Sequence, residues 1–167
     1  MQINTVVIIK HPLEPVWEAM QNQLSEIAFQ VDDIESIQLQ ERQVSEASEV
    51  VITNVWKAKP MLPDFLKSMI QPDMLTWTDT AVWKTSSRTC HWVIHSHYFK
   101  EKMDCTGVTL FEPALGGRGC RLSVQGNLQW NGGTIGVLQQ GIEAVIGNII
   151  PANFRKLAHA VEGFLHG

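Results

Sequence analysis

Several features that would direct this sequence toward a particular class of protein are missing. It has no run of about 18 or more apolar residues, so it predicts no membrane-spanning helix. Charged residues make up only 18%, with 13 Lys and Arg against 17 Asp and Glu, and no basic cluster predicts a nucleic-acid surface. The first residues lack the basic start and the cleavage site of a signal peptide, so we expect a cytoplasmic protein.

Short motifs of common catalytic and cofactor sites are also missing. The sequence has no Gly-x-Ser-x-Gly elbow and no metalloprotease helix motif, and the glycines of residues 116–119 lie in a turn between strands rather than before a helix. His91, His95 and His97 share one strand face, and the last two could chelate a metal. Because no acidic residue accompanies them at a fixed spacing and the face points outward, we expect no metal and no cofactor.

The composition is that of a folded domain with a sizeable core. The chain has 167 residues, of which 44% are hydrophobic, so we expect one domain over residues 1–167. Low charge and high hydrophobic content exclude a disordered chain. Three cysteines are present, an odd number that favours reduced, buried thiols over disulfides: Cys90, Cys105 and Cys120.

Apolar residues recur with two different periods along the chain. Residues 3–9 form a strand-like run, and a helical period begins after Pro15, which suits a first helical turn. Alternation with period two then dominates about six stretches between residues 34 and 130. Residues 134–165 are helical, and we expect Pro151 to kink or break this helix near its preceding turn.

This order of elements resembles the START/Bet v 1-like superfamily, also called SRPBCC. Residues 11–20 (HPLEPVWEAM) are similar to its proline-led entry into the first helix. Residues 105–113 and 117–128 resemble its last hairpin, and residues 141–144 (GIEA) resemble bacterial members of unknown function. The resemblance implies an α+β helix-grip fold. In it, a curved antiparallel sheet of about seven strands wraps around a long C-terminal helix, with short helices after the first strand. It also implies a cavity between sheet and helix for an apolar ligand.

Strand parity places a set of aromatic side chains on the inner face of this sheet: Trp56, Trp77, Trp83, Trp92, Tyr98 and Trp130. They could line a pocket and bind a ligand through their polar N–H and O–H groups, or they could fill the core. Together with the polar residues beside them and one position on the helix, they give our candidate ligand-binding set: Asn54, Trp56, Trp77, Asp79, Trp83, Trp92, Ser96, Tyr98 and Ile142.

Asp79 is the most informative polar residue of that set. It shares a strand face with Trp77, Ala81 and Trp83, where desolvation would raise the pKa of a carboxyl group. Such a group suits a general acid or base, with Tyr98 as a donor. The alternatives are that the strand is bulged and Asp79 is solvated, or that Asp79 pairs with an arginine.

Three functions remain open from the sequence. The first is binding of a hydrophobic small molecule of the lipid, polyketide or terpenoid class, and the second is a cyclase or dehydratase of the polyketide type using Asp79. The third is a non-catalytic interaction module that presents apolar side chains between the prolines at positions 60 and 72, namely Leu62, Phe65, Leu66 and Met69. We expect a small-molecule ligand, no nucleic acid and no stable membrane insertion, and the sequence leaves the oligomeric state open.

Overall fold

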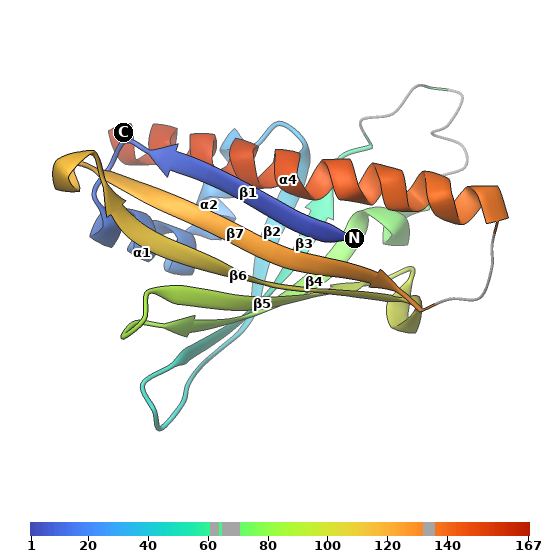
Figure 1. Ribbon diagram of the computed structural model, residues 1–167, viewed down its shortest axis with the longest axis horizontal. Coiled ribbons are helices and arrows are strands. Elements are labelled where there is room, and N and C mark those ends of the chain that lie inside the picture. Colours follow the sequence, from blue (N-terminus) through green and yellow to red (C-terminus); the bar gives the residue numbers. More distant parts are fainter. Residues whose placement is uncertain (61–63, 65–70, 132–135) are drawn as a thin grey trace.

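Seven antiparallel strands form one curved sheet, and a long C-terminal helix lies along it (Figure 1). The computed structural model describes residues 1–60, 64, 71–131 and 136–167, and for residues 136–149 it describes the backbone alone. The strands are β1 (Gln2–Ile9), β2 (Ile34–Val44), β3 (Val50–Ala58), β4 (Thr76–Lys84), β5 (Thr89–Ser96), β6 (Met103–Ala114) and β7 (Gly119–Trp130).

The helical elements lie after the first strand, in the connections and at the C-terminus. They are α1 (Leu13–Asn22), α2 (Leu24–Ile27), η1 (Ala28–Gln30), η2 (Pro72–Leu75), η3 (Lys100–Lys102), η4 (Leu115–Gly117) and α4 (Gly136–His166). Pro15 lies in the first turn of α1, where its missing N–H leaves no hydrogen bond unmade.

The strand order is β1-β7-β6-β5-β4-β3-β2, and every neighbouring pair is antiparallel. From β2 to β7 each strand pairs with the next one along the chain, and the first strand pairs with the last. The expected helix-grip fold, with its short helices after the first strand, is confirmed.

The C-terminal half of α4 packs beside β1 and against α1 (Figure 1). Its buried side chains are Leu157, Ala158, Ala160 and Val161, and the backbone N–H of Lys10 donates to Glu162 Oε2 at 2.9 Å. Of the expected kink or break before Pro151, the break is wrong, because α4 runs through this proline as one helix. A proline removes one N–H donor, and the turns on either side continue the helix around the missing bond. No helix in the described ranges is long and apolar enough to span a membrane.

An aromatic cluster fills the core where α1 meets the sheet. Trp17 of α1 lies edge-on to Trp83 and to Phe111, with ring centroids 5.0 Å away in each case. Arg88 covers the Trp17 ring at 5.1 Å and forms an ion pair with Glu14. For Trp83, which is only 5% exposed, the structure therefore favours the core-filling alternative over pocket lining.

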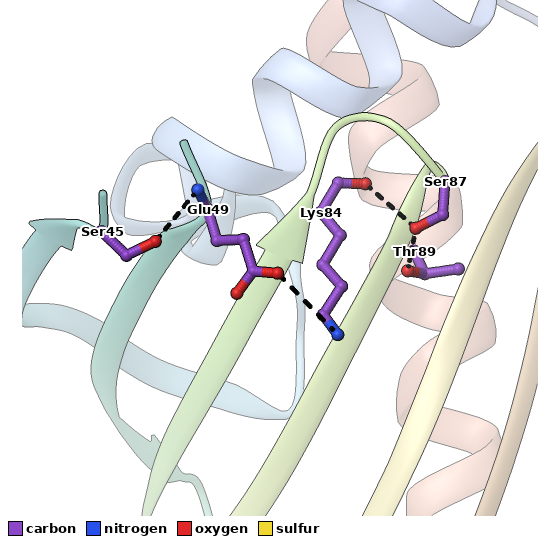
Figure 2. Close-up of polar contacts among 5 residues, drawn as sticks. All are labelled: Ser45, Glu49, Lys84, Ser87 and Thr89. Carbon is purple, nitrogen blue, oxygen red and sulfur yellow. Dashed lines mark hydrogen bonds and ion pairs between the residues drawn. The ribbon is translucent and has the colours of Figure 1, made fainter. Parts of the chain in front are cut away.

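Polar contacts hold the hairpins at this end of the sheet (Figure 2). The backbone N–H of Glu49 donates to Ser45 Oγ at 3.2 Å, and the Glu49 carboxylate lies 3.9 Å from Lys84 Nζ. The hydroxyl groups of Ser87 and Thr89 are 2.7 Å apart across the next turn. These exposed contacts fix the turns.

Candidate functional site

One row of inward-facing residues crosses the sheet at the level of Asp79. In the strand register, Asp79 on β4 pairs with Asn54 on β3 and with Ile94 on β5. The row continues through Cys105 on β6 to Leu128 on β7. Directly opposed residues on antiparallel strands lie on the same face, so the predicted inward orientation of Asp79 is confirmed.

The next row lies one step closer to the start of α4. On this row Trp56 of β3 pairs with Trp77 of β4, which pairs with Ser96 of β5. Farther across the same face, Met103 of β6 pairs with Trp130 of β7. The rings of Trp56 and Trp77 are stacked, with centroids 5.8 Å apart and planes at 17°. This end of the inner face therefore carries two parallel indoles directly beside Asp79.

Burial of the inner face changes along the strands. Near α1 it is almost complete, as at Phe111 and Leu122, which are 2% and 1% exposed. In the two rows described above, four inward side chains keep part of their accessible surface: Trp77, Asp79, Ile94 and Trp130. α4 begins at this end of the sheet (Figure 1). The candidate site is this incompletely covered end.

Asp79 has an unusual electrostatic environment. Desolvation raises the pKa of its carboxyl group from 3.8 to about 7, against a smaller lowering by the Trp56 side chain. The indole N–H of Trp56 is near enough to act on the carboxyl group, but Trp56 Nε1 and Asp79 Oδ1 have no hydrogen bond partner of ordinary geometry in the described part of the chain. Neither the bulged nor the arginine-paired alternative for Asp79 is therefore favoured.

Trp92 lies next to this site, across two neighbouring strands, and at 4% exposed it fills the core as Trp83 does. A Cβ atom added at Gly107 would lie 2.2 Å from its Cζ2 atom, and one at Gly126 would lie 2.8 Å from its Cη2 atom. Its Nε1–H donates to Thr109 Oγ1 at 3.2 Å, and its ring lies 5.8 Å from that of Phe154 on α4. The indole therefore lies flat against the backbone of β6 and β7, and only glycine at positions 107 and 126 leaves room for it.

Two predicted site residues, Ser96 and Tyr98, lie at the end of β5. The structure places Tyr98 away from the face that strand alternation predicts. β5 ends at Ser96, so Tyr98 lies in the following turn and is 42% exposed; its expected place on the inner face is wrong. The strand ends there because Ser96 Oγ accepts the backbone N–H groups of Tyr98 and Phe99, at 3.3 and 3.1 Å. Ser96 is buried, and its hydroxyl proton remains available as a donor.

Other candidates lie outside the site or outside the described residues. His91 and His95 are exposed, and His97 lies 2.8 Å from the Thr78 hydroxyl group. Across the ranges that the structure describes, no three His, Cys, Asp or Glu side chains are placed to hold a metal ion. The side chain of Ile142 and the predicted interaction patch (Leu62, Phe65, Leu66 and Met69) lie outside the described residues.

The three cysteines are free and buried, as expected. Desolvation raises the pKa of Cys90 well above its usual value and those of Cys105 and Cys120 to about 11, and the charge of Asp79 adds to the shift at Cys90 and Cys105. Because the thiolate is the reactive form, these shifts oppose a nucleophilic role.

The sequence matches no family model, and no curated protein matches it at a significant level. Solved structures do match. A protein of Thermus thermophilus aligns with a TM-score of 0.70 and 15% identity, over 98% of this chain and 95% of the other. The Zhui aromatase/cyclase of Streptomyces aligns at 0.64 and 13% (98% and 92%), and norcoclaurine synthase of Thalictrum flavum at 0.64 and 7% (99% and 86%). At these identities the likeness establishes the shared fold.

Sequence reasoning missed some structural features of this end of the sheet. It placed Trp130 on the inner face but not in the ligand-binding set, and it gave no role to Gly107 and Gly126. Parity alone could have included Trp130. The two glycines become informative only when the β6–β7 register shows that they are opposite one another and under Trp92.

Proposed function

We propose that this protein binds an apolar small molecule between the inner face of its sheet and α4, at the end marked by Trp77 and Asp79. The observation that carries the proposal is Asp79 itself. Desolvation raises the pKa of its carboxyl group to about 7 and its Oδ1 atom is buried, yet the residue as a whole is only partly buried. A group that is surrounded by protein and still accessible is expected on the wall of an enclosed space.

The surroundings of Asp79 support an apolar ligand with few polar atoms. Trp77 and Ile94 flank it with partly exposed apolar surface, and that surface would be removed from water by a ligand. Such burial stabilises a complex by roughly 25 cal/mol per Å². Asn54, Trp56 and Asp79 would orient the ligand through hydrogen bonds, since all three lie on the inner face.

A direct binding experiment tests this proposal. We expect native mass spectrometry of gently purified protein to detect a bound small molecule, and an apolar fluorophore to quench tryptophan emission saturably at one site per chain. The Trp77→Leu variant should bind the fluorophore more weakly, because the substitution removes partly exposed aromatic surface. Leu39→Ala, which trims an exposed apolar side chain elsewhere, serves as the surface control. No bound species and no saturable quenching with lipid, terpenoid and polyketide probes would contradict the proposal.

Acid–base catalysis is the second candidate function, and the position of the Asp79 pKa favours it. A catalytic acid or base works best when its pKa lies near the working pH, and about 7 meets that condition. Two structural neighbours are an aromatase/cyclase and a synthase by name. The exposed Tyr98 is not placed to assist Asp79. Turnover of an identified substrate that survives in Asp79→Asn would exclude this function and leave binding intact.

A further inference from the structure

Three buried polar atoms at this end of the sheet make no hydrogen bond of ordinary geometry within the described ranges, although the Trp56 indole still acts on the Asp79 carboxyl group. They are Trp56 Nε1, Asp79 Oδ1 and Trp130 Nε1. A buried polar atom without a partner loses its hydrogen bonds to water and gains none in return, so native proteins rarely keep one unless something else satisfies it. Trp92 shows the ordinary arrangement, because its buried indole N–H donates to Thr109.

The unpartnered atoms fall into two groups on opposite sides of the inner face. Trp56 and Asp79 are diagonal neighbours on β3 and β4, whereas Trp130 ends β7. Four strand spacings separate β3 from β7, or about 19 Å along the sheet. The curvature of the sheet and the inward reach of the indoles shorten the gap between the two N–H groups. Between them lie apolar side chains, Ile94 among them.

Both indole N–H groups are donors and cannot accept a hydrogen bond. We infer that the ligand is an elongated apolar molecule with an oxygen acceptor at each of two separated positions, one bound by Trp56 beside Asp79 and the other by Trp130. This inference deepens the proposed function and rests on it. At the first position the Asp79 carboxyl group, when neutral, adds a second donor to the same oxygen.

Matched probes separate the polar contribution from the apolar one. Dodecane, its methyl ketone and the diketone with a carbonyl near each end have the same length and differ only in acceptors. Binding is measured by displacement of an apolar fluorophore. One hydrogen bond contributes a factor of about three to ten in affinity. We expect Trp56→Phe to reduce the affinity for the ketone and the diketone by that factor and to leave the affinity for dodecane unchanged. Trp130→Phe should reduce the affinity for the diketone most.

The matched control is Trp77→Phe, which removes an indole from the same row whose Nε1 is not among the unpartnered atoms. It should weaken all three probes alike. If Trp56→Phe and Trp130→Phe reduce the affinity for all three probes equally, or reduce it for none, the inference is overturned. The proposed binding of an apolar molecule would still stand. If no probe binds the wild-type protein, the proposed function itself fails.

A spectroscopic measurement on wild-type protein keeps the inference testable if a variant does not fold. The side-chain N–H resonances of Trp56 and Trp130 should move downfield when the diketone binds and stay nearly fixed with dodecane, because only a carbonyl accepts their protons. The Trp92 resonance should not respond differently to the two probes, since its proton is already bonded. Identical shifts with both probes at Trp56 and Trp130 would overturn the inference.

Discussion

Replacing Asp79 with Asn should stabilise the protein by about 2 to 4 kcal/mol at pH 8 and change its stability little at pH 4. The folded protein holds the Asp79 proton up to about pH 7, whereas the unfolded chain releases it near pH 3.8. Between these values the folded state binds more protons than the unfolded state. The stability of the wild-type protein therefore falls as the pH rises through this window.

The size of this effect follows from the shift in the pKa. A rise from 3.8 to about 7 is about three pH units, and each unit corresponds to 1.36 kcal/mol, which gives about 4 kcal/mol as an upper value. Access of water to the partly exposed side chain lowers it, hence the lower bound of about 2 kcal/mol. Asn has nearly the same shape and no charge, so the variant should lose the pH dependence.

Urea denaturation at a series of pH values measures this effect. Asp73→Asn is the matched control, because Asp73 is an exposed aspartate just before β4 and its loss should not alter the slope between pH 4 and 7. If Asp79→Asn shows the same fall in stability as the wild-type protein across that range, Asp79 is not the desolvated group that the site requires.

The second large effect is expected at Gly107, where an alanine should destabilise the protein by about 3 kcal/mol. The new Cβ atom would lie 2.2 Å from Trp92 Cζ2 and 2.6 Å from the backbone oxygen of Gln125. The indole cannot move away without breaking its bond to Thr109, and the backbone of β7 cannot move without disturbing the strand pairing. Thermal or urea unfolding measures the loss.

A second substitution shows whether Trp92 causes this cost. In a Trp92→Phe background, the smaller ring should relieve part of the clash, so Gly107→Ala should be less costly there than in the wild-type protein. Gly163 in α4 provides the control, since its nearest neighbour for a Cβ is the flexible side-chain oxygen of Gln30 at 3.3 Å. Gly163→Ala should be neutral or stabilising by up to about 1 kcal/mol. Equal costs for Gly107→Ala in both backgrounds would contradict the placement of Trp92.

The order of elements and the orientation of Asp79 were predictable from the sequence because both depend on local periodicity, whereas the helix-grip arrangement was implied by the family resemblance. Alternation along residues 76–84 is enough to place Asp79 beside Trp77 and Ala81, and the structure agrees. Alternation fails where a strand ends, as at Ser96, whose hydroxyl group turns the chain and places Tyr98 outside. A side chain that ends a strand gives no periodic signal.

Features that depend on partners across the sheet could not be predicted. Trp83 and Trp77 share one strand face, yet one is packed against Trp17 of α1 and the other is stacked on Trp56 and partly exposed. Which tryptophan fills the core depends on where α1 lies over the sheet. That position is a property of tertiary packing, and the sequence period along β4 contains no information about it.

The central claim is that the ligand lies against Asp79 inside the protein. The most direct test is the carboxyl carbon chemical shift of Asp79, followed by NMR from about pH 3 to about pH 9 with and without a saturating apolar ligand. We predict a midpoint near pH 7 in the free protein. Ligand binding should move it higher, because the ligand removes the remaining water from the carboxyl group. A midpoint near 3.8 that the ligand leaves unchanged would contradict the account.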